Sequence, residues 1–82
     1  MAAPIALEHL VSKLEALKEG MDSGEFDHGE YDQRLARIIA ELRDRKLDAD
    51  RAAITSTLAD LQRRQVIPQS VREHLENRLG LK

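Results

Sequence analysis

The stretch from Gly24 to Leu42, GEFDHGEYDQRLARIIAEL, constrains the fold most because it specifies where a helix begins. Asp27 suits the N-cap position, where a carboxylate accepts hydrogen bonds from free amides of the first turn. Glu30, three residues later, can reach back to the Asp27 amide and complete a capping box. Phe26 and Tyr31, the only two aromatic residues, have the spacing of a hydrophobic staple. We therefore predict a helix that begins just after Asp27.

Apolar residues at helical spacing divide the chain into four predicted helices. Pro4 can occupy the first turn of the first helix, where a missing amide removes no hydrogen bond. Leucines then follow at alternate spacings of three and four as far as Met21. The later helices are expected at about 28–46, 49–64 and 68–80, and Gly80 suits a left-handed C-cap. Hairpin one then covers about residues 5–46 and hairpin two about 49–80, within a single helical domain spanning 1–82.

The join between the second and third helices is open to two interpretations. No Gly or Pro occurs between Glu30 and Ile67, so one helix of about 35 residues, roughly 50 Å long, remains an alternative. The apolar phase nevertheless slips at Leu47, and Asp48 or Asp50 can cap a new helix. We favour a break near residues 47–50.

Composition limits the kind of protein this can be. With 82 residues and 2% aromatic content, the core must come almost wholly from Leu, Ile, Val and Ala. Cysteine is absent, which excludes disulfides and thiolate chemistry. No apolar run approaches the roughly 20 residues of a membrane span, and the N-terminus lacks the basic start of a secretory signal. We expect a soluble, cytoplasmic protein with no membrane partner.

Reactive or metal-binding groups are few. His9, His28 and His74 lie on three predicted helices and could converge on a metal with Asp27 or Glu30, but each histidine position is predicted to face solvent. The acidic residues around the first turn lack the order of a calcium loop. No phosphate-binding glycine loop or nucleophile with a base is present. We therefore expect no metal, no cofactor, no catalytic residue and no enzyme activity.

The two halves of the chain share a pattern that predicts a repeated helical hairpin. Leu14 and Leu17 precede Gly24 and Phe26, and Leu58 and Leu61 precede Gln65 and Ile67 in the same way. Tyr31 and Leu35 then correspond to Val71 and Leu75, although the second copy is one residue shorter at this point. Stacking two such hairpins would bury faces that neither buries alone. Coincidence remains the alternative.

The first hairpin resembles the short C-terminal domain called SHOCT. The resemblance covers about residues 7–42 and includes LEAL at 14–17, GEFD at 24–27, Glu30-Tyr31 and RLARII at 34–39. A fainter likeness covers 58–79, where Gln65 replaces the turn glycine and Pro68 the capping residue. The resemblance implies a non-catalytic role in oligomerisation or protein contact. It departs from the usual setting, since we expect no larger domain for the hairpin to follow.

We expect an all-α protein of four helices in two hairpins, a small bundle that self-associates or binds another protein as an adaptor or regulator. The predicted protein-interaction residues are Leu7, Leu10, Leu14, Leu17, Tyr31, Leu35, Ile38 and Leu42. The alternative is a small nucleic-acid-binding regulator that uses a central basic cluster. Its predicted contacts are Arg34, Arg37, Arg43, Arg45 and Lys46. Interspersed acids, a net charge of −2 and the lack of stacking aromatics favour the protein-binding role.

Overall fold

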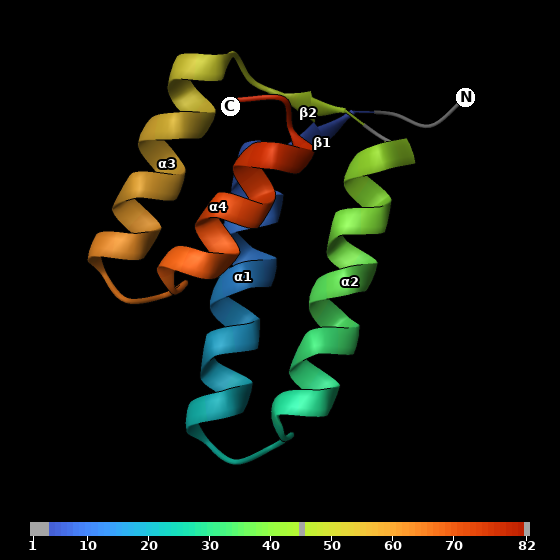
Figure 1. Ribbon diagram of the computed structural model, residues 1–82, viewed down its shortest axis with the longest axis vertical. Helices are drawn as coiled ribbons and strands as arrows, with labels where there is room; N and C mark the ends of the chain where they lie inside the picture. Colours follow the sequence, from blue (N-terminus) through green and yellow to red (C-terminus); the bar gives the residue numbers. More distant parts are fainter. Residues whose placement is uncertain (1–3, 45, 82) are drawn as a thin grey trace.

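The structure is a computed structural model that describes residues 4–44 and 46–81. It confirms a small all-α fold of two helical hairpins (Figure 1). The helices are α1 (Leu7–Asp22), α2 (His28–Asp44), α3 (Arg51–Arg63) and α4 (Gln69–Arg78). The α1–α2 turn lies at the bottom of Figure 1. None of the helices in the described part of the chain has the length and apolarity needed to span a membrane.

Two short strands that the sequence analysis missed join the hairpins. β1 (Ile5–Ala6) pairs in parallel with β2 (Leu47–Asp48), and the Ile5 amide donates to the Lys46 carbonyl at 2.8 Å. The prediction that Pro4 occupies the first helical turn is therefore wrong, because α1 begins only at Leu7. The extended conformation uses the Ile5 amide in the strand ladder and leaves the Ile5 side chain buried.

The predicted break between the second and third helices is confirmed. α2 ends at Asp44, slightly before the expected boundary at Lys46, and β2 follows. Asp50 then caps α3, since its carboxylate accepts a hydrogen bond from the Ala53 amide at 2.7 Å. The alternative of one continuous helix is wrong because this cap and the strand pairing supply the hydrogen bonds that a continued helix would otherwise provide.

The core is a single cluster of aliphatic side chains drawn from both hairpins and from β1. No aromatic ring is fully buried among the described residues, in agreement with a core built from Leu, Ile and Val. The hairpins therefore stabilise one another by sharing buried surface. The buried apolar residues are Ile5, Leu10, Leu14, Leu17, Ile38, Ile39, Leu42, Ile54, Leu58, Leu61, Ile67, Val71 and Leu75.

The two hairpin turns have the same backbone hydrogen bonds. In the first, the amides of Ser23, Gly24 and Glu25 donate to the carbonyls of residues 19, 21 and 20. In the second, the amides of residues 64, 65 and 66 donate to residues 60, 62 and 61, which keeps a constant offset of 41 residues. Gly24 and Gln65 both have positive φ, at 73° and 63°. The predicted pairing of these two positions is confirmed as a Schellman-type helix end.

The constant offset also corrects the predicted register of the helices. Leu17 corresponds to Leu58 and Gly20 to Leu61, whereas the sequence pattern paired Leu14 with Leu58. After the turn, the backbone stays in step, because Tyr31 and Arg72 make the same first helical hydrogen bond. Val71 and Leu75, both buried in α4, nevertheless lie one position earlier in this alignment than the partly buried Tyr31 and Leu35 of α2. Leu79 falls in step with Ile38, so the one-residue difference does not extend along the whole helix.

The corner around Asp27 forms only part of the predicted arrangement. The Asp27 carboxylate accepts from the Glu30 amide at 2.9 Å, which confirms the cap. The Glu30 carboxylate binds Arg34 at 3.3 Å. Of the two hydrogen bonds of a capping box, the described contacts therefore contain only the one from the Glu30 amide to the Asp27 carboxylate. Phe26 packs over Gly20, where an added methyl group would overlap its ring, and the Arg34 guanidinium lies 4.6 Å from the ring centroid. Phe26 and Tyr31 line two different grooves.

Candidate functional site

Most of the predicted interaction residues lie inside the chain's own core. Leu10, Leu14, Leu17, Ile38 and Leu42 are each at most 9% exposed. Leu7, Tyr31 and Leu35 are only partly buried and pack against the edge of that core. In the folded monomer, these three are therefore the predicted residues that a partner can reach. Their role in binding stays a prediction.

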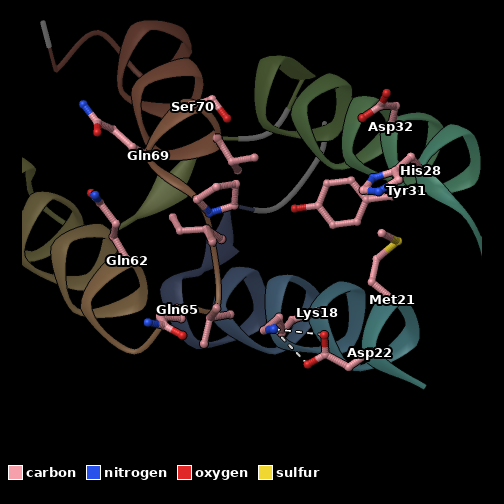
Figure 2. Close-up of a pocket in the computed structure, with 14 residues that line it drawn as sticks. Lys18, Met21, Asp22, His28, Tyr31, Asp32, Gln62, Gln65, Gln69 and Ser70 are labelled. Carbon is pink, nitrogen blue, oxygen red and sulfur yellow. Dashed lines mark hydrogen bonds and ion pairs between the residues drawn. The ribbon is translucent and has the colours of Figure 1, made fainter. Parts of the chain in front are cut away.

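Tyr31 lies in a groove with a volume of about 630 Å³. We call it the inter-turn groove because it runs between the first turn of α2 and the α3–α4 turn (Figure 2). The Tyr31 ring extends into the groove, and its hydroxyl points towards the side formed by Gln69 and Ser70. Both hairpins contribute to the walls, so the groove exists only when they are docked. Its apolar lining residues are Met21, Tyr31, Val66, Ile67, Pro68 and Val71.

Charges in the inter-turn groove are few and partly paired. Lys18 binds both carboxylate oxygens of Asp22, at 2.8 and 3.0 Å (Figure 2). Asp32 lies on the α2 side of the groove. Burial raises the pKa of Tyr31, the Asp32 carboxylate raises it further, and Lys18 opposes them. Tyr31 is therefore a neutral hydrogen-bonding group at ordinary pH, in a groove whose charged lining residues, one lysine and two aspartates, give a formal charge of −1.

Three glutamine side chains border the groove on the side of the second hairpin. Gln62 accepts from Arg72 at 2.8 Å, and Gln69 donates to Glu73 at 3.4 Å. Gln65 is exposed at the turn itself, in the left-handed conformation that disfavours every residue except glycine. These amides carry both donors and acceptors, so the groove can bind polar groups of either kind.

The residues of the predicted nucleic-acid site do not form one surface. Arg34 and Arg37 line a groove beside Phe26, between α1 and α2. Arg43 and Lys46 line another groove at the opposite end of α2. Arg45 lies outside the described residues. Because an α-helix rises about 1.5 Å per residue, Arg34 and Arg43 are roughly 13 Å apart along α2.

The histidines also remain apart. His9, His28 and His74 are all exposed on different helices. Across residues 4–44 and 46–81, no group of three or more histidine and acidic side chains is placed to hold a metal ion. The arrangement offers grooves for binding, and the absence of metal and catalytic chemistry stays a prediction.

Comparisons with protein-family models, with curated proteins and with solved structures found no match. The resemblance of the first hairpin to SHOCT therefore stays a prediction that rests on the residues themselves. Tyr31 is recognisable from the sequence, but the inter-turn groove is not, because it forms between the start of α2 and the α3–α4 turn, which are far apart in the sequence. No local signal in the sequence places the start of α2 beside the α3–α4 turn.

Proposed function

We propose that this chain is a non-enzymatic protein-interaction module that self-associates through the inter-turn groove, and that it acts as an adaptor or regulator. The observation that carries the proposal is the Tyr31 ring, which is only partly covered although it projects into an apolar-lined groove of about 630 Å³. Buried Tyr side chains contribute large apolar area and a hydrogen bond at protein interfaces. A second copy would cover Tyr31 together with Met21 and Val66.

A second copy suits the groove because the groove complements itself. In a twofold dimer the same patch of each subunit meets its copy, so a patch with a strong charge of one sign would repel itself. Here Lys18 and Asp22 neutralise each other, so the remaining formal charge of the lining is the −1 of Asp32. The three glutamine side chains of the groove bring both donors and acceptors. Small domains also gain stability from burying further surface in an oligomer.

The test compares the wild type with Tyr31→Glu by light scattering over a micromolar concentration series. The wild type should show a mass near twice the 9.3 kDa of the chain. The glutamate buries a charge in the contact, so we expect the dimer dissociation constant to rise at least about tenfold. Glu is a good helix former and suits the first turn of α2, so the variant should still fold.

Gln33→Glu is the matched control, because it adds the same charge at an exposed position of α2 outside the groove. It should leave the dimer intact. The ionisation of Tyr31, the only tyrosine, gives an independent readout through tyrosinate absorbance. Its pKa should rise further as concentration increases, since dimerisation adds burial to the burial that already raises it. A monomeric wild type, or a dimer that Tyr31→Glu leaves unchanged, would rule out this contact.

A cytoplasmic location and the SHOCT-like role in protein contact are part of the same proposal. Fractionation of cells that express the full chain would test the location. Capture of the untagged chain by a tagged copy from those cells would test self-association in place, with Tyr31→Glu as the negative control.

A further inference from the structure

A second groove lies at the other end of the molecule, where the ends of α2, α3 and α4 meet β2 (top of Figure 1). It has a volume of about 580 Å³, and we call it the basic groove. Four exposed cations, Arg43, Lys46, Arg51 and Arg78, form its rim. Among the residues that the structure describes, no acidic side chain lines it. Its floor consists of buried or partly buried aliphatic side chains: Leu42, Leu47, Ala49, Ile54, Leu79 and Leu81.

The four cations of the rim have no ion-pair partner among the residues that the structure describes. Other arginines are paired: Arg63 and Arg64 both bind Asp60, and the Arg63 hydrogen bond is the main cause that lowers the Asp60 pKa. The carboxylate of Asp50, which is near the rim in sequence, caps α3. The basic groove thus concentrates unneutralised positive charge around an apolar surface.

We propose that the basic groove binds an acidic amphipathic helix of a partner protein. Carboxylates of such a helix would pair with the cations of the rim, and its apolar side chains would cover the aliphatic floor. Arginine supports this because its planar guanidinium can bind a carboxylate through two parallel hydrogen bonds. Three of the four cations are arginines, and they come from α2, α3 and α4, so they surround the floor on several sides.

The combination of rim and floor favours this occupant over three others. Nucleic acid would use the cations, but the floor offers no aromatic ring for base stacking. A flat anionic membrane would not fill a concave groove. A second copy meeting the same patch would bring four more positive charges against the first four. A helix with carboxylates beside leucines satisfies both parts of the site.

The probe is a synthetic peptide of about twelve residues, roughly 18 Å of helix, with leucines spaced three and four apart and glutamates elsewhere. Titration of the full chain, followed by calorimetry and by backbone amide NMR shifts, should show saturable binding at low salt. The largest shifts should fall at residues 46–51 and 78–81. We expect affinity to drop at least about tenfold on going to high salt, because exposed ion pairs are screened.

Arg43→Glu combined with Arg51→Glu should weaken peptide binding at least about tenfold. Arg37→Glu is the matched control, since Arg37 is exposed on the same helix, α2, outside the basic groove. Tyr31→Glu should also leave binding unchanged, which separates this site from the inter-turn groove. A peptide with lysines in place of glutamates should not bind, and a glutamate peptide without leucines should bind at least about tenfold more weakly because the floor stays uncovered.

Three results would overturn the proposal. The first is an absence of peptide binding by the wild type at low salt. The second is equal binding by the double variant and the wild type, with circular dichroism showing that both are folded. The third is tighter binding of mixed-sequence DNA, or of phosphatidylserine vesicles, than of the leucine-glutamate peptide. Each of these probes uses the full chain.

Discussion

The two hairpin turns have the same backbone hydrogen bonds but different pairs of side chains at the corresponding positions. In the first turn a small residue, Gly20, lies beneath a large one, Phe26. At the corresponding positions of the second turn, Leu61 and Ile67 are both aliphatic and almost fully buried, at 0% and 2% exposure. The same backbone motif therefore accepts a Gly–Phe pair in one turn and a Leu–Ile pair in the other.

The turns also differ in how well their residues suit the backbone. Gly24 adopts positive φ without a steric penalty, and Gly80 does the same at the end of α4. Gln65 holds the equivalent conformation in the second turn although its Cβ disfavours it. The surrounding hydrogen bonds and the buried Ile67 must offset this strain. The second turn therefore depends on packing more than the first does.

The largest expected effect comes from removing that packing. Leu61→Ala should lower the free energy of unfolding by about 2–5 kcal/mol, because Leu61 is fully buried and its truncation leaves a cavity. Urea unfolding followed by circular dichroism measures the change. A loss below about 1 kcal/mol would show that the second turn can collapse around the smaller side chain.

A smaller effect is expected when the size pattern of the second turn is copied into the first. Gly20→Leu alone should lower the free energy of unfolding by about 1–3 kcal/mol, since its side chain meets the Phe26 ring. Adding Phe26→Ile recreates the pair found in the second turn and should recover much of the loss. A double-mutant cycle by urea unfolding gives the coupling between the two sites. Additive losses would mean that the two turns are not interchangeable.

The smallest effects concern the left-handed position itself. Gly24→Ala should destabilise the chain by about 1 kcal/mol, because alanine has a Cβ at positive φ. Gln65→Gly should instead stabilise it by roughly 0.5 kcal/mol, because glycine removes the steric strain at positive φ. The greater conformational entropy of glycine in the unfolded chain offsets part of this gain. Thermal unfolding of the two variants against wild type measures both changes. A shift of the same sign in both would contradict the strain assigned to Gln65.

The parts of the fold that local chemistry determines were predictable from the sequence. Asp27 and Asp50 cap helices where their side chains can accept from nearby amides. Gly24 and Gln65 were paired correctly because the turn residues themselves carry the pattern. The change in apolar spacing at Leu47 likewise located the break between α2 and α3, because this pattern is also local in the sequence.

Features that arise between distant segments were not predictable in this way. A two-residue strand such as Ile5–Ala6 is too short to show an alternating pattern. The Phe26 ring turned towards Gly20 and Arg34, a choice that depends on the space left by packing. The basic groove unites Arg43 and Arg51 with Arg78, and nothing local marks Arg78 as their neighbour.

The strand pair has a consequence for the order of folding during synthesis. Each hairpin forms through contacts between neighbouring stretches of the chain. The hydrogen bond from the Ile5 amide, in contrast, can form only when the distant Lys46 carbonyl is available. A growing chain on the ribosome can complete the first hairpin before β1 and β2 have paired. The pairing of β1 with β2 therefore forms late, only after the segment that links the first hairpin to the second has left the ribosomal exit tunnel.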